Sequence, residues 1–142
     1  MYRHILIPTD GSELAERGVT HGLGLAKSLG AKVSVIFVVE PFSEMTGRFR
    51  ETVAGYAELR KEQATSVLDR AANAAKEAGV SCETVQVENE QPHQAITAAA
   101  ENKGCDLIVM SSHGRSGLSM LLIGSVTNKV LTHAKTPVLV CQ

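Results

Sequence analysis

The chain has 142 residues, of which 44% are hydrophobic and 20% are charged, and its formal net charge is -1 at pH 7. This length predicts one compact domain covering residues 1–142, and the near-neutral charge does not indicate a field that attracts polyanions, so nucleic acid is not an expected partner. The longest apolar runs have the length of strands, and the N-terminus has no long apolar leader, so we expect a cytoplasmic protein that does not bind membranes.

Short β-rich segments alternate with longer helical segments from the N-terminus onward. We expect strands at residues 3–9, 31–40, 80–88, 105–112 and 137–142. Helices are expected at residues 12–30, 92–104 and 125–134, and a long amphipathic stretch ends at Ala78, with the region around Gly55 as a candidate turn. Such alternation predicts the α/β class, with helices on both faces of an open parallel sheet.

The first predicted helix has clear end signals. Ser12 or Asp10 is the expected N-cap, and Gly30 is the expected C-cap. Inside this helix, the segment GLG at residues 22–24 resembles part of a dinucleotide-binding fingerprint, but the third glycine is missing. We therefore interpret these glycines as a packing feature.

Two loops follow predicted strands and carry small and polar residues. The segment PTDGS, residues 8–12, ends the first strand, and SSHGRSG, residues 111–117, ends the fourth. In open α/β sheets a ligand binds at the carboxyl ends of the strands, where the strand order reverses. If the first and fourth strands are neighbours, both loops face one crevice.

The second loop and the start of the last helix have the chemistry of a phosphate site. Glycines there allow a positive φ and a close approach to a ligand, and the helix start offers free N–H groups to an anion. Hydroxyls and a guanidinium add donors. The alternative is that the glycines only make a turn, the serine only caps the helix and the arginine is solvated. The residues concerned are Gly114, Arg115, Gly117, Gly124, Ser125 and Thr127.

Familiar phosphate-binding and hydrolase motifs are absent from the chain. No lysine follows a glycine, which excludes G-x-x-x-x-G-K-[ST], and no G-x-S-x-G elbow occurs. The five histidines show no metal-ligand spacing. At His113, in the second loop, a hydrogen bond that orders the loop is favoured over a role as catalytic base.

Three separated segments resemble the universal stress protein family. Its ATP-binding members carry G-2x-G-9x-G-[ST] between the fourth strand and the last helix. Here Gly114, the nine residues RSGLSMLLI and the pair Gly124-Ser125 match the second half of this motif, whereas Ser111 stands at the position of the first glycine. The opening ILIPTDGS and the ending TPVLVC are also typical of the family.

The resemblance implies a Rossmann-like fold of the adenine nucleotide alpha hydrolase type, with five strands in the order 3-2-1-4-5. It implies ATP, with Mg²⁺, bound where the first and fourth strands diverge, with the backbone of Val38 at the adenine. It also implies a homodimer that pairs its last strands antiparallel. The implied binding positions are Pro8, Thr9, Asp10, Val38, Met110, Ser111, Ser112, Gly114, Gly124, Ser125 and Val126.

Two of these positions have more than one interpretation. Asp10 either serves the metal or the ribose, or caps the first helix locally. Ser111 is strained and crowds the ribose if the position needs a positive φ, but it costs nothing and can donate to the ligand if the backbone is extended.

The function expected first is an ATP-binding stress or signalling module with little or no hydrolysis, in which nucleotide orders the 111–125 loop and so changes a surface for unknown protein partners. A nucleotide-independent dimeric interaction module, which Ser111 favours, and a slow ATPase are the alternatives.

Overall fold

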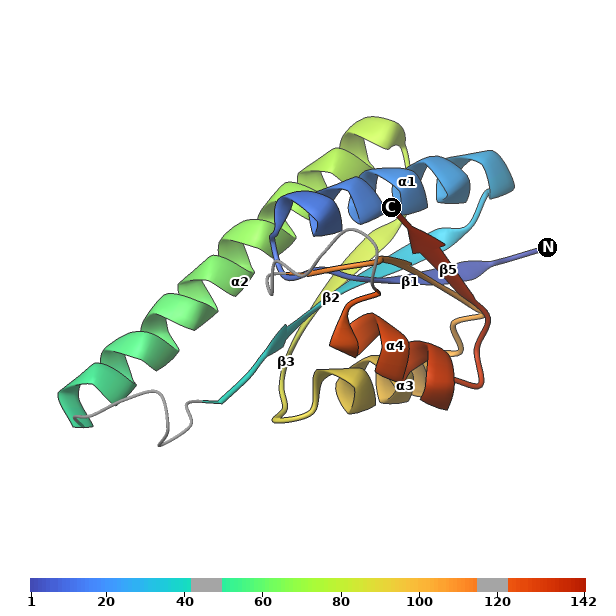
Figure 1. The fold of residues 1–142 in the computed structure, drawn as a ribbon. Coiled ribbons are helices and arrows are strands. Elements are labelled where there is room, and N and C mark those ends of the chain that lie inside the picture. Colours follow the sequence, from blue (N-terminus) through green and yellow to red (C-terminus); the bar gives the residue numbers. More distant parts are fainter. Residues whose placement is uncertain (42–49, 115–122) are drawn as a thin grey trace.

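The computed structural model describes residues 1–41, 50–114 and 123–142 (Figure 1). The elements follow the expected alternation: β1 (His4–Pro8), α1 (Glu13–Leu29), β2 (Lys32–Val39), α2 (Arg50–Ala78), β3 (Cys82–Glu88), α3 (Pro92–Lys103), β4 (Leu107–Ser111), α4 (Ser125–His133) and β5 (Val138–Cys141). All strand pairs are parallel, in the order β3-β2-β1-β4-β5. The expected α/β class and strand order are therefore confirmed.

The central strands carry apolar side chains on both faces of the sheet, and helices cover and bury both faces. α1 and α2 lie on one face, and α3 and α4 lie on the other (Figure 1). Alternate side chains of β1 enter the two cores: Ile5 and Ile7 pack with α1 and α2, whereas Leu6 packs with α3 and α4. Burial on both faces explains why the sequence of β1 reads as a continuous apolar run.

The helix ends agree with their sequence signals. The Ser12 side chain caps α1 by accepting a hydrogen bond from the backbone N of Ala15 at 3.2 Å, and Gly30 ends the helix with a left-handed φ of 66°. The candidate turn at Gly55 is wrong, because α2 runs unbroken through this residue. A single exposed glycine costs a helix only about 1 kcal/mol, which a helix as long as α2 readily tolerates.

The first and fourth strands are neighbours, as the site prediction required. β1 pairs with β2 on one side and with β4 on the other, with Ile5 opposite Leu107. The chain leaves β1 for α1 on one face and leaves β4 for α4 on the opposite face (Figure 1). The two loops therefore diverge around a crevice at the carboxyl ends of these strands.

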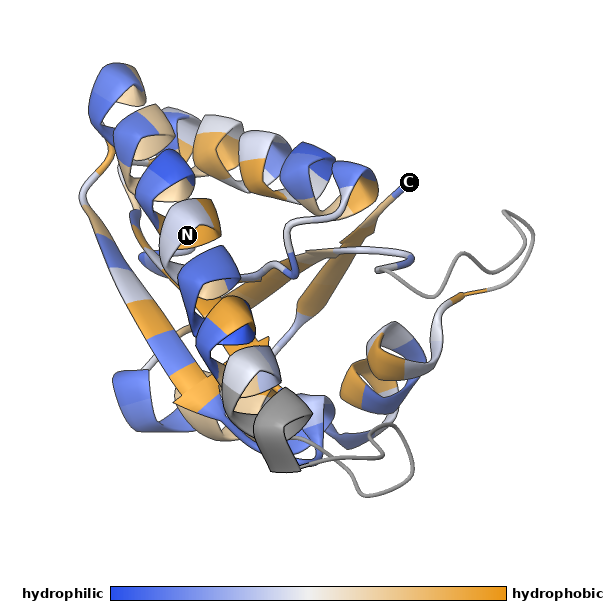
Figure 2. Cartoon of the chain, turned by 90° about the vertical axis from the view of Figure 1, so that its left-hand side faces the viewer, coloured by the Kyte–Doolittle hydropathy of each residue, from blue (hydrophilic) through white to orange (hydrophobic). Residues whose placement is uncertain are grey.

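β5 forms one edge of the sheet, next to β4. Figure 2 shows that this strand is hydrophobic along its length up to the C-terminal end. Leu139, in its middle, is 37% exposed. Within the described ranges, no helix is both long enough and apolar enough to cross a membrane.

Candidate functional site

A cavity of about 360 Å³ opens at the carboxyl ends of β1, β2 and β4. The N-terminus of α4 and residues of α1, α2 and α3 complete its wall. Most of the predicted site residues line it: Pro8, Thr9, Asp10, Val38, Met110, Ser111, Gly114, Gly124, Ser125, Val126 and Thr127. Ser112 does not line this cavity, and Arg115 and Gly117 lie outside the described residues.

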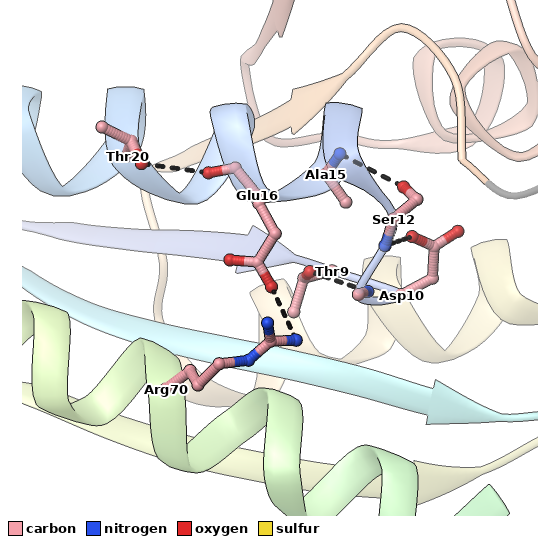
Figure 3. Close-up of polar contacts among 8 residues, drawn as sticks. Thr9, Asp10, Ser12, Ala15, Glu16, Thr20 and Arg70 are labelled. Carbon is pink, nitrogen blue, oxygen red and sulfur yellow. Dashed lines mark hydrogen bonds and ion pairs between the residues drawn. The ribbon is translucent and has the colours of Figure 1, made fainter.

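The loop after β1 is held by its own side chains (Figure 3). Thr9 Oγ1 accepts a hydrogen bond from the backbone N of Gly11 at 3.2 Å, and Asp10 Oδ1 accepts one from the backbone N of Ser12 at 2.9 Å. Asp10 is thus not the N-cap of α1, a role that Ser12 fills. Figure 3 also shows Glu16 of α1 paired with Arg70 of α2 at 3.3 Å, which links the two helices beside this loop.

Ser111 occupies the position of the missing motif glycine without backbone strain. Among the described residues only glycines have a positive φ, so the strained alternative for Ser111 is wrong. Its hydroxyl donates to the carbonyl of His113 at 2.7 Å, and Thr127 Oγ1 donates to the carbonyl of Ser111 at 2.9 Å. The Thr127 hydroxyl therefore holds the end of β4 against α4, and the Ser111 hydroxyl fixes the chain just after β4. Both hydroxyl protons are used within the fold and are not offered to a ligand.

Gly114 brings the two loops together. It does not have the positive φ that the sequence suggested. The reason for glycine is instead its neighbour: a Cβ at this position would overlap Asp10 Oδ2 and lie 3.3 Å from Asp10 Cγ. The loops after β1 and β4 are in contact at this point because Gly114 has no side chain.

Gly124 places the start of α4 directly on the chain that leaves β4. It is the N-cap of α4, with φ at -61°, and its backbone N donates to the Ser112 carbonyl at 2.7 Å. A Cβ here would lie 3.1 Å from that oxygen, so a larger residue would require the chain after β4 to shift by a few tenths of an ångström. The alternative role of Ser125 as the cap is wrong, because Ser125 is the first helical residue.

The N-terminus of α4 has the properties of an anion site. Among the residues that the structure describes, no side chain caps it, and its first turn holds no acidic residue. The first intrahelical bond runs from Asn128 N to the Gly124 carbonyl at 2.9 Å, so the preceding N–H groups have no partner within the helix. Together with the helix dipole, these donors favour a negatively charged group in the adjoining cavity.

Several wall residues escaped the sequence prediction. They come from elements distant in the chain or were given another role: Ala15, Ile36, Glu40, Arg60, Pro92, Ile96 and His113. Arg60 of α2 reaches the cavity with its guanidinium 5.6 Å from the centre of the Phe37 ring. No local motif marks Arg60, because its place depends on how α2 crosses the sheet.

Comparison with known proteins gives consistent matches over the full chain. The model of the universal stress protein family matches residues 1–142. The universal stress protein MJ0531 of Methanocaldococcus jannaschii is 37% identical over 144 residues, which cover 100% of this chain and 83% of that protein.

Two solved structures have the same fold. The protein MJ0577, also from Methanocaldococcus jannaschii, is 30% identical with a TM-score of 0.84, covering 99% of this chain and 95% of that one. A universal stress protein solved in complex with cAMP is 27% identical with a TM-score of 0.73, covering 99% and 97%.

Proposed function

The chain belongs to the universal stress protein family, and on this premise we propose that it binds an adenine nucleotide, ATP with Mg²⁺, in the cavity between β1 and β4. In this proposal the protein is a nucleotide-responsive stress or signalling module with little or no hydrolysis. The nucleotide contacts the 111–125 segment, of which residues 115–122 lie outside the described residues, and so changes a surface for protein partners. The expected cytoplasmic location and the absence of nucleic acid as a partner stay predictions.

The observation that carries the proposal is the uncapped N-terminus of α4 opening into a cavity of about 360 Å³. This volume lies within the range typical of small-ligand sites. The cAMP complex of a relative with the same fold supports an adenine nucleotide as the ligand. Free N–H groups at one end and an apolar wall at the other match a molecule with a charged phosphate and a planar base.

The residues of the cavity fit the parts of ATP. The N–H groups at the start of α4 and the space left by Gly124 would hold phosphate oxygens. Asp10 would face the ribose, and the backbone of Val38 would face the adenine. No cluster of three His, Cys, Asp or Glu side chains occurs in the described ranges, so Mg²⁺ would enter with the phosphates and supply charge neutralisation. The missing glycine–lysine loop and G-x-S-x-G elbow support binding without rapid hydrolysis.

Binding is tested by thermal unfolding and calorimetry on nucleotide-free protein, with and without Mg-ATP. Ligand at about 100 times its dissociation constant adds roughly 2.7 kcal/mol to the stability. For a chain of this length we expect the melting temperature to rise by about 10 °C. Gly124→Ala should abolish this rise, since the added Cβ would crowd the Ser112 carbonyl.

Gly24→Ala is the matched control, because a Cβ at Gly24 meets no atom within 4 Å. It should keep the full response to ATP. No response of the native protein at millimolar ATP would contradict nucleotide binding and favour the interaction module. Phosphate release well above background would contradict only the low rate of hydrolysis.

We also propose a homodimer that pairs the β5 strands of two copies. The support is the position of β5 at the sheet edge and its hydrophobic sequence. Exposed edges of this kind are usually covered or paired in native proteins.

A further inference from the structure

His4 and Ser34, two buried polar residues near the amino ends of β1 and β2, are paired with each other. His4 Nε2 lies 2.7 Å from Ser34 Oγ, and the Ser34 hydroxyl donates to Glu83 Oε1 at 2.7 Å. Lys103 Nζ donates to the same carboxylate oxygen at 2.9 Å. Burial lowers the pKa of His4, in keeping with a neutral ring that is satisfied within the fold.

His113, at the carboxyl end of β4, is different. It is only 4% exposed, and its Nδ1 lies 3.0 Å from Ser112 Oγ. Its Nε2 is shielded from solvent and has no hydrogen-bond partner in the described part of the chain. Arg60 Nε is likewise shielded from solvent and without a hydrogen-bond partner among the described residues. Both His113 and Arg60 line the cavity. A buried nitrogen without a partner in a native fold usually has an acceptor that the protein alone does not supply, such as a bound ligand or a water molecule.

The hydrogen-bond partners of His113 assign its neutral tautomer. If the Ser112 hydroxyl donates to Nδ1, then Nε2 carries the proton and is the single unpaired group. If Nδ1 donates instead, both the hydroxyl proton and Nε2 are left without partners among the described residues. The first arrangement satisfies more groups, so Nε2 is assigned as a donor.

The donor edge of the ring faces the start of α4. A Cβ at Gly124 would lie 3.8 Å from Cδ2 of His113, the carbon bonded to Nε2. Gly124 is the N-cap of α4, and the next residues carry N–H groups without intrahelical partners. The imidazole ring and these backbone donors are therefore neighbours beside the cavity that both His113 and Gly124 line.

We infer that His113 is a specificity-determining residue, which donates from Nε2 to a phosphate oxygen of the bound nucleotide and so favours adenosine phosphates over adenosine. This inference rests on the proposed nucleotide site. A hydrogen bond from a buried donor to a charged oxygen is among the stronger ones in proteins, whereas adenosine brings no such acceptor.

The test compares the binding of ATP, AMP and adenosine to His113→Leu, His113→Gln and the native protein by calorimetry. Leu removes the donor at similar size, and it should raise the dissociation constants of ATP and AMP roughly tenfold or more. The adenosine constant should stay within about twofold, because adenosine makes no phosphate contact with His113 and the lost Ser112 bond lies within the protein. Gln keeps an N–H near the position of Nε2 and should restore most of the affinity for ATP. His133→Leu, at an exposed histidine of α4, is the control and should match the native protein.

Two readouts separate ligand recognition from a structural role. Without nucleotide, His113→Leu should melt within a few degrees of the native protein, because the loss of the Ser112 bond and the removal of an unpaired buried donor act in opposite directions. ¹⁵N spectra of the native protein should place the ring proton on Nε2 and show its signal shifting when ATP binds. This second readout needs no variant and still applies if His113→Leu does not fold.

Three results would overturn the inference alone while nucleotide binding stands. They are an ATP affinity unchanged in His113→Leu, an equal loss for ATP and adenosine, or a ring proton located on Nδ1 with ATP bound. Failure of the native protein to bind any of the three ligands would overturn both this inference and the proposed function.

Discussion

At the scale of single residues, the structure explains why this chain can carry Ser111 where the ATP-binding motif of the family has its first glycine. Its backbone has no positive φ, so a serine fits where the family motif has glycine. Its side chain is buried and bonded to the His113 carbonyl. Ser111 therefore stabilises the chain that leaves β4, and its presence gives no reason to expect a closed site.

Restoring the motif glycine should accordingly weaken the protein. Ser111→Gly loses the hydroxyl bond, worth about 1 kcal/mol, and adds backbone freedom worth about 0.5–1 kcal/mol. We expect the unfolding free energy to fall by roughly 1–2 kcal/mol, as measured by urea denaturation. Ser111→Ala should show only the first part of this loss. A gain in stability for Ser111→Gly would mean that the serine is strained after all.

At the scale of elements, α1 lies close to the sheet because of small residues on one face. Gly18 and Gly22 both face inward: a Cβ at Gly18 would lie 3.3 Å from the backbone N of Ser111, and one at Gly22 would overlap Ile7 Cδ1. Gly24 points into open space. Of the GLG segment, Gly22 thus has the packing role that the sequence indicated.

This contrast gives a matched pair of variants within one helix. Gly22→Ala should lower the unfolding free energy by about 1–3 kcal/mol, because it overpacks the contact with β1. Gly24→Ala should raise it by up to about 1 kcal/mol through helix propensity. Urea unfolding of both variants measures the difference, and equal effects would contradict the close packing of α1 on β1.

At the scale of the whole molecule, the proposed dimer depends on the β5 edge of the sheet. Ile108 N donates to the Pro137 carbonyl at 2.9 Å and Ser112 N to the Cys141 carbonyl at 2.8 Å. Because alternate residues of a parallel strand bond to the same neighbour, the backbone groups of Val138 and Val140 face away from β4. These are the groups that a second copy would pair with.

Val140→Pro should therefore convert the proposed dimer to a monomer. The substitution removes one outward N–H and leaves the bonds between β4 and β5 in place, and proline is tolerated on strand edges. Light scattering at micromolar concentration measures the assembly. Val140→Ala, which keeps the N–H group, should remain dimeric. A monomeric native protein, or a dimeric proline variant, would contradict pairing through β5.

The sequence by itself determined the features that depend on residues close together in the chain. The Ser12 cap, the left-handed Gly30 and the apolar strand runs each follow from local backbone chemistry or from burial on both faces. Motif spacing then identified the family, which the full-length match confirms, and the structure has the strand order that the family implied.

Only the tertiary structure decided what each site residue does. Ser111 and Thr127 bond to the chain itself, Gly114 makes room for Asp10, and Arg60 arrives from a helix that carries no motif. These roles arise from contacts between segments far apart in sequence, which the spacing within any one segment does not encode. The unpaired Nε2 of His113 belongs to the same class, because burial without a partner is a property of the assembled fold.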